Sequence, residues 1–207
     1  MLTWLFPNVC PTCGAVITPQ SVQCADCVRH CPPEPLRLPI KTVGTVRVWC
    51  TALYVYRGPI REALHQFKFN RQRSRGAGFG ALMSRVFPQD AIDLVTFVPM
   101  ARDKQRMRGY NQAELLAKAC AKGLQRPMKS TLKKVRSTGT QHELNAEARA
   151  RNAVGAYEAE QLHGERVLLC DDIVTTGATL RACAEALLAA GASEVHCICV
   201  AWTKGEL

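Results

Sequence analysis

The chain has 207 residues, of which 47% are hydrophobic, and this is enough for one well-packed core with a small appendage. Its formal net charge of +10 favours an anionic partner, either a nucleic acid or a phosphorylated metabolite. No apolar run approaches the length of a transmembrane helix, and the start lacks the basic region of a signal peptide. We therefore expect no membrane insertion and a cytoplasmic location.

The amino-terminal segment contains two C-x-x-C pairs. Their members are Cys10, Cys13, Cys24 and Cys27. Four thiolates at this spacing are typical of a structural Zn²⁺ site, and metal binding would supply the folding energy that so short a segment lacks. Cys31 and His30 follow directly and remain alternative ligands, whereas a redox C-x-x-C is disfavoured by the close pairing and the absence of a βαβ pattern. We expect a zinc-finger module at residues 1–34 and a second domain at 35–207.

The rest of the chain alternates between strand and helix patterns. A proline-rich stretch at residues 32–39 predicts a stiff linker. Strands are expected at 43–56 (one or two), 94–98, 167–170 and 195–201, and helices at 58–69, 76–87, 111–123 and 180–191. This alternation indicates a parallel sheet with helices on its faces. The cysteines beyond the amino-terminal segment lie in apolar runs and are expected to be core residues: Cys50, Cys120, Cys170, Cys183, Cys197 and Cys199.

Residues 57–75 carry many basic side chains against a single acid, Glu62, and residues 122–136 form a second basic stretch. Candidates for nucleic-acid contacts in the first stretch are Arg57, Arg61, Lys68, Arg71, Arg73 and Arg75. Aromatic residues are interleaved with them, at Tyr54, Tyr56, Phe67 and Phe69. Positive charge with rings for base stacking is typical of single-stranded nucleic-acid sites. The alternatives are solvated helix faces for the cations and core positions for the rings.

Residues 97–112 also predict a strand, a loop and a helix, and this loop is basic. Its cations are Arg102, Lys104, Arg106 and Arg108. Basic side chains before a helix N-terminus can bind a phosphate group, so the loop is a candidate anion site. The alternative is an exposed basic loop without a ligand.

Residues 167–179 have the sequence VLLCDDIVTTGAT. The apolar start predicts a buried strand and the end predicts a helix, so the loop lies where unpaired N–H groups and the helix dipole favour a phosphate. The adjacent carboxylates of Asp171 and Asp172 would repel a bare phosphate. They suit a ligand that also offers hydroxyl groups or a bridging cation, and a ribose 5-phosphate offers both. An acidic turn in an ordinary βα unit is the alternative.

This string resembles the motif with which type I phosphoribosyltransferases bind PRPP, 5-phosphoribosyl 1-pyrophosphate. The resemblance implies that Asp171 and Asp172 hold the ribose hydroxyls and that the following loop holds the 5-phosphate. The implied loop residues are Thr175, Thr176, Gly177, Ala178 and Thr179. It also implies an α/β fold with a type I phosphoribosyltransferase-like parallel sheet flanked by helices, Mg²⁺ bound with PRPP, and a pyrophosphate loop at the basic segment 102–108.

A narrower resemblance comes from residues 108–117, RGYNQAELLA, which match the R-G-[FY]-N-Q-A-x-x-L-A signature of the ComF-type family. This family comprises bacterial phosphoribosyltransferase-like proteins associated with competence for DNA uptake. Residues 141–157 and 56–69 match further family segments, and an amino-terminal zinc module is a family feature. Residues 98–101 depart from the family, because they have VPMA where V-P-V-P is common. The resemblance implies a mobile loop that brings Arg151 and Asn152 to the ligand when it closes.

The resemblance implies a PRPP-binding protein that acts in natural transformation. Its expected role is to handle incoming single-stranded DNA in the cytoplasm, with proteins of the DNA-uptake machinery as partners. The alternative is an active phosphoribosyltransferase of nucleobase or other metabolite salvage that does not bind DNA. Such an enzyme would displace pyrophosphate at the anomeric carbon of the ribose, with Mg²⁺ and the basic loop stabilising the leaving group. The sequence identifies neither a general base nor a pocket for an acceptor.

Overall fold

The computed structural model describes residues 8–40, 48–69, 72–135 and 155–204. Its centre is a five-stranded sheet in the order β1-β2-β7-β6-β3. The strands are β1 (Leu36–Ile40), β2 (Val48–Val55), β3 (Leu94–Phe97), β6 (Arg166–Val174) and β7 (Glu194–Trp202). β1 is antiparallel to β2, whereas the other neighbouring strands are parallel. The expected parallel sheet is confirmed, with an antiparallel strand added at one edge.

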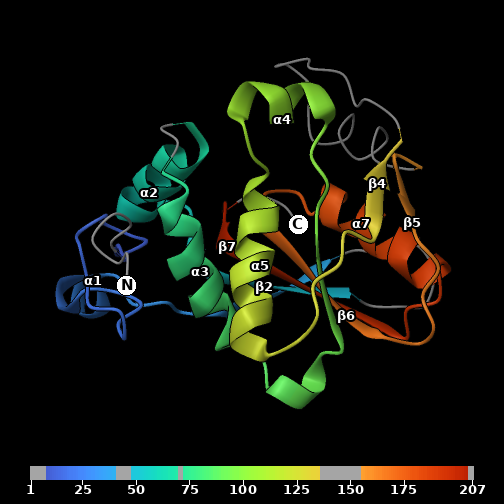
Figure 1. Ribbon diagram of the computed structural model, residues 1–207, viewed down its shortest axis with the longest axis horizontal. Helices are drawn as coiled ribbons and strands as arrows, with labels where there is room; N and C mark the ends of the chain where they lie inside the picture. Colours follow the sequence, from blue (N-terminus) through green and yellow to red (C-terminus); the bar gives the residue numbers. More distant parts are fainter. Residues whose placement is uncertain (1–7, 41–47, 70–71, 136–154, 205–207) are drawn as a thin grey trace.

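Helices cover both faces of this sheet (Figure 1). On one face, α5 (Gln112–Leu124) packs beside α3 (Ser74–Ser84), and its Cys120 contacts Cys170 of β6. On the other, Cys183 of α7 (Ala178–Ala189) lies near Asp171 of β6. Because neighbouring residues of a strand point to opposite faces, α5 and α7 must lie on opposite sides of β6. The sheet is therefore the middle of three layers, as the alternating pattern predicts.

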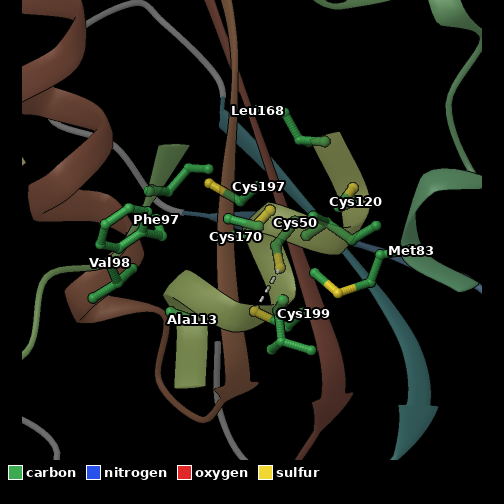
Figure 2. Packing of buried hydrophobic residues seen from close by; sticks show 14 of the residues in the cluster. Cys50, Met83, Phe97, Val98, Ala113, Cys120, Leu168, Cys170, Cys197 and Cys199 are labelled. Carbon is green, nitrogen blue, oxygen red and sulfur yellow. Dashed lines mark hydrogen bonds between the residues drawn. The ribbon is translucent and has the colours of Figure 1, made fainter. Parts of the chain in front are cut away.

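Burial on both faces explains the unbroken apolar runs of the central strands. Residues 167–170 of β6 are all fully buried, and so are most residues of β7. Small cysteine side chains fill the space between sheet and helices, and Cys50 and Cys199 approach to an Sγ–Sγ distance of 3.7 Å (Figure 2). The cysteines that were expected in the core are all buried and unpaired by disulfides.

The remaining elements are short or lie at the periphery of the sheet. They are α1 (Ala25–His30), α2 (Gly58–Phe69), the 3₁₀ turn η1 (Gln89–Ala91), α4 (Arg102–Arg108) and a two-stranded sheet of β4 (Leu132–Lys134) and β5 (Tyr157–Ala159). Among the helices in the described ranges, none is long and apolar enough to cross a membrane.

Three local expectations were wrong. The proline-rich stretch is not only a linker, because its second half forms β1, where an edge position tolerates the missing N–H of Pro39. The basic segment is not a loop but the helix α4, which buries no residue and so has no apolar periodicity to reveal it. Strand β6 does not stop at Cys170 but continues to Val174, so the acid pair belongs to the strand itself.

Candidate functional site

The acid pair lies at the carboxyl-terminal part of β6, where parallel strands present ligand-binding loops. Asp171 Oδ1 accepts a hydrogen bond of 2.8 Å from the N–H of Asp172. Burial, followed by the neighbouring Asp172 carboxylate, raises the pKa of Asp171 to about 7. Two carboxylates in a half-buried position are stabilised by a cation or by hydroxyl donors, because burial and the like neighbouring charge disfavour ionisation.

The counter-ion that the protein itself provides is Lys68, at the end of α2. Its Nζ lies 3.0 Å from Oδ2 of Asp172, and both side chains are largely shielded, with 20% and 14% of their surface exposed. The sequence placed Lys68 among the nucleic-acid candidates. The structure instead pairs it with the acid pair, because α2 brings its last turn over the carboxyl end of β6.

The loop after β6 turns the chain into α7 at Gly177, whose φ of 71° is left-handed and favours glycine. Ala178 begins α7, and its N–H reaches Oγ1 of Thr176 at 3.5 Å. Thr175 and Thr179 are exposed at the same helix start. Hydroxyl groups and the first N–H groups of α7 thus lie together beside the acid pair, in a setting that favours an anion.

Two residues that were not among the expected site residues also lie at this helix. The ring of Tyr157 in β5 packs against Ala178 and Ala182 of α7, and its hydroxyl lies near the side chain of Thr179. Lys134 in β4 has its Nζ 5.8 Å from the centroid of that ring. No sequence signal marked them, since β4 and β5 are too short for an alternating pattern. The expected loop residues Arg151 and Asn152 follow in the chain between these strands but lie outside the described residues.

Helix α4 carries the four cations of the expected pyrophosphate loop and stands clear of the sheet at the top of Figure 1. Arg102, Lys104 and Arg106 are exposed. Lys104 is also close enough to Lys134 to contribute, after burial, to lowering the pKa of the Lys134 ammonium group. Two cations within electrostatic reach of each other form a surface that an anion would stabilise.

Arg108, the last cation of α4, has protein partners instead of open solvent. Its guanidinium donates a 2.7 Å hydrogen bond to Gln112 and lies 5.2 Å from the ring centroid of Phe69. It therefore connects the start of α5 with the end of α2.

The nucleic-acid candidates of residues 57–75 divide into different environments. Arg57, Arg61 and Arg73 are exposed, and Arg73 lies over the ring of Tyr110 at 4.7 Å. Arg75 is wrongly assigned, because it is only 3% exposed and donates to backbone carbonyls of the amino-terminal module. Arg71 lies outside the described residues.

The aromatic candidates divide in the same way. Tyr54 and Phe67 are buried in the core, so they cannot form a stacking surface, whereas Tyr56 is half-buried against it. Phe69 is 60% exposed and has the imidazole of His65 at a centroid distance of 4.8 Å. Phe69 is therefore the most exposed of the four expected rings, and Tyr56 is half-buried.

The four expected cysteine ligands come together in the amino-terminal module. The sulfur atoms of Cys10, Cys13, Cys24 and Cys27 all lie within 4.8 Å of one another. Tetrahedral Zn–S bonds of about 2.3 Å place sulfurs at comparable separations, so the cluster fits a zinc ion. His30 and Cys31 are not part of this cluster, and the His30 ring instead contacts the carbonyl of Asp26.

Comparison with known proteins places this geometry in a family. A profile described as phosphoribosyl transferase domain matches residues 111–206. The DNA utilization protein YhgH of Salmonella typhimurium (strain LT2) is 30% identical over 209 residues, spanning 93% of this chain and 84% of that protein. The chain belongs to the ComF family of phosphoribosyltransferase-like proteins.

A competence protein agrees with the match, and one solved structure is similar to part of the chain. Competence protein ComFC of Bacillus subtilis (strain 168) is 30% identical over 190 residues, covering 89% of this chain and 73% of that protein. The structure of glutamine PRPP amidotransferase from B. subtilis, complexed with ADP and GMP, is similar over 59% of this chain and 25% of its own, with 25% identity and a TM-score of 0.41.

The structure gives a physical account of the ComF signature at residues 108–112. Tyr110 donates from its hydroxyl to the carbonyl of Phe67 in α2. Asn111 caps α5 by accepting from the N–H of Ala113, and it donates to the carbonyl of Val98 after β3. Gly109 ends α4 with a φ of 81°. Through these hydrogen bonds the signature residues connect the end of α2, which carries Lys68, to the start of α5.

Proposed function

We propose that this protein binds PRPP and acts in the handling of incoming single-stranded DNA during DNA uptake, in the cytoplasm. The PRPP part is supported chiefly by one observation: two carboxylates on β6 stand beside the N-terminus of α7, with Lys68 as their counter-ion. Asp171 and Asp172 receive the ribose hydroxyls, and residues 175–179 receive the 5-phosphate through N–H and hydroxyl groups.

The basic helix α4 is the proposed site for the pyrophosphate end of the ligand, through Arg102, Lys104 and Arg106. Lys134 of β4 lies within electrostatic reach of Lys104 and adds to this positive surface. Arg151 and Asn152 remain proposed contacts of a closing loop. Mg²⁺ neutralises the pyrophosphate when PRPP is bound, and the acid pair provides the oxygen ligands or water contacts that such an ion prefers. Zn²⁺ is the proposed structural ion of the cysteine cluster.

PRPP affinity is expected to rise as pH increases through about 7, because the Asp171 carboxyl loses its proton there. The ionised carboxylate accepts hydrogen bonds from ribose hydroxyls, whereas the protonated group competes as a donor. Calorimetry between about pH 6 and about pH 8 measures the change, and buffers of different ionisation enthalpy reveal the released proton. An Asp171→Asn variant retains only the titration of the ligand's own phosphates. If that variant showed the wild-type pH profile, the titrating group would not be Asp171.

The DNA part rests on one face of α2. Arg57 precedes the helix, and Arg61, His65 and Phe69 follow it at intervals of four residues, so these exposed side chains share one face. Arg108 adds positive charge beside Phe69, and the exposed Arg73 lies over Tyr110 and donates to the carbonyl of Gly109. Cations that contact phosphates next to a ring that stacks on a base are the two elements of single-strand binding without sequence specificity. The competence and DNA-utilization names of the relatives favour the same partner.

Single-strand affinity is expected to fall with rising salt, with a slope of about −0.7 per contacted phosphate. Replacing Arg57, Arg61 and Arg73 by Gln should flatten this slope and leave PRPP binding unchanged. Fluorescence anisotropy at several salt concentrations provides the measurement. The control replaces Lys118, Lys122 and Lys129 by Gln, which removes the same charge from other exposed positions. Equal slopes for the two triple variants would exclude α2 as the DNA surface.

Turnover separates this proposal from an active salvage transferase. Incubation with PRPP, Mg²⁺ and a panel of nucleobases, with pyrophosphate release as the readout, tests for transfer. Sustained release with one base, together with no single-strand binding at low salt, would favour the transferase and eliminate the DNA role.

A further inference from the structure

A buried arginine faces the cysteine cluster without a carboxylate partner. Arg75, in the first turn of α3, is 3% exposed. Among the described residues no salt bridge includes it. Its hydrogen bonds go to uncharged oxygens, namely the side chains of Gln66 and Gln72 and the carbonyls of Pro11 and Thr12. A guanidinium so deeply withdrawn from water needs a compensating negative charge nearby.

The two carbonyls that Arg75 contacts belong to the loop between Cys10 and Cys13. Its Nη1 donates to Pro11 O at 2.7 Å and to Thr12 O at 2.8 Å. The N–H groups of these same two peptide units, on Thr12 and Cys13, lie near the sulfur of Cys10 and are directed toward it. Each peptide unit therefore has its oxygen toward the guanidinium and its N–H toward a metal-ligating sulfur. The peptide dipoles are aligned between a positive and a negative group, and this is the favourable orientation.

The guanidinium of Arg75 also packs closely against the backbone of this loop. A Cβ added to Gly14, just after the loop, would lie 2.8 Å from Nη2 of Arg75. Gln66 accepts from Nη2 on the other side at 2.5 Å. The nearest acid along this chain of contacts is Glu62, which is exposed and bonds to the amide of Gln66, not to Arg75.

Four thiolates around one Zn²⁺ carry a net double negative charge. We infer that Arg75 is the positioning residue and counter-charge of the metal centre, and that it acts on the Cys10 sulfur through two peptide groups. This inference rests on the proposed tetrathiolate zinc site. Zinc binding and the packing of the amino-terminal module on α3 should then be thermodynamically coupled. Loss of the ion would leave the buried guanidinium of Arg75 without a compensating charge and so weaken this packing.

The test compares zinc affinity among single variants, by competition with a chromogenic chelator. Arg75→Met is expected to weaken zinc binding by at least about tenfold, the scale of one lost charge-assisted interaction. Arg75→Lys, which retains the charge without the planar fork, should fall between this variant and wild type. Arg73→Met removes an exposed arginine two positions away, and Glu62→Gln removes the nearest acid; both should remain within about twofold of wild type.

A spectroscopic readout separates a counter-charge from a merely structural role. With Co²⁺ in place of zinc, the sulfur-to-metal charge-transfer band of Arg75→Met should shift from its wild-type energy, and Arg75→Lys should restore part of the shift. A folded Arg75→Met protein with wild-type zinc affinity and an unshifted band would overturn the inference.

A reciprocal measurement uses the wild-type protein and does not depend on how well a variant folds. Stripping zinc should increase hydrogen exchange in the first turn of α3 and leave α7 unchanged. Unchanged exchange in α3 would also overturn the inference. Wild-type protein that binds no zinc would instead remove the metal site itself, so the two failures are distinguishable.

Discussion

Replacing Asp171 and Asp172 together by asparagine is expected to weaken PRPP binding by at least about a hundredfold while the fold remains intact. Each charge-assisted hydrogen bond contributes about 1.5–3 kcal/mol, and both carboxylates are proposed to accept from the ribose. Asparagine retains the side-chain oxygen that accepts from the N–H of residue 172, so the local backbone is preserved. Calorimetric titration with PRPP and Mg²⁺ measures the effect.

The Asp171→Asn single variant has a distinctive stability signature. The pKa of Asp171 is raised by burial to about 7, so the folded state holds its proton more tightly than the unfolded chain. Its contribution to stability is present below the unfolded pKa of about 4 and is lost as pH rises through about 7. Above pH 7 the buried Asp171 carboxylate is unfavourable, so the single variant, which retains Asp172 and its ion pair with Lys68, should melt at the same temperature as wild type or higher.

The matched control replaces Asp90 and Asp93 by asparagine and so changes the net charge by the same amount. Asp93 pairs with Arg166 at the start of β6, away from the acid pair near the end of that strand. This control should bind PRPP normally. Wild-type affinity in the Asp171, Asp172 variant, or an equal loss in the control, would contradict the proposed ribose site.

Removing the cysteine ligands is expected to unfold the amino-terminal module. Zinc contributes on the order of 10 kcal/mol or more to small tetrathiolate modules, and this segment has little core of its own. In a Cys13→Ser, Cys24→Ser variant, bound zinc should disappear and protease should cleave within residues 8–31. Elemental analysis and limited proteolysis, with and without a chelator, measure both effects.

The control for this prediction is Cys31→Ser, which alters a cysteine close to the cluster but outside it. It should retain zinc and protease resistance. The melting temperature of the Cys13→Ser, Cys24→Ser variant should also change, because the module contacts the rest of the protein. Gln23 of the module donates a hydrogen bond of 3.1 Å to Tyr54 Oη. Full zinc content in the ligand variant, or loss of zinc in the control, would show that the ligand set is different.

The sequence by itself determined the local and repetitive features of the protein. The apolar runs of β6 and β7 predicted buried parallel strands, because a strand covered on both faces needs no polar positions. Likewise, the spacing of two C-x-x-C pairs predicted the cluster that the structure brings together. These features depend on residues close in the chain, where short-range geometry decides the outcome.

Elements without a core-facing side could not be predicted from the sequence. Helix α4 buries nothing, and β4 and β5 are three residues each, so neither period nor length distinguished them from loops. Strand β1 was hidden by Pro39, which an edge position tolerates but a central strand would not.

Only the tertiary structure decided what each basic residue does. Lys68, Arg73 and Arg75 belong to one basic stretch, yet Lys68 pairs with Asp172, Arg73 is exposed, and Arg75 is buried against the cysteine module. A cation's role depends on its solvation and its nearest opposite charge or dipole, and here those partners come from segments far away in the chain. Composition could therefore indicate an anionic ligand, but the division of these cations among ligand site, surface and metal centre arose from folding.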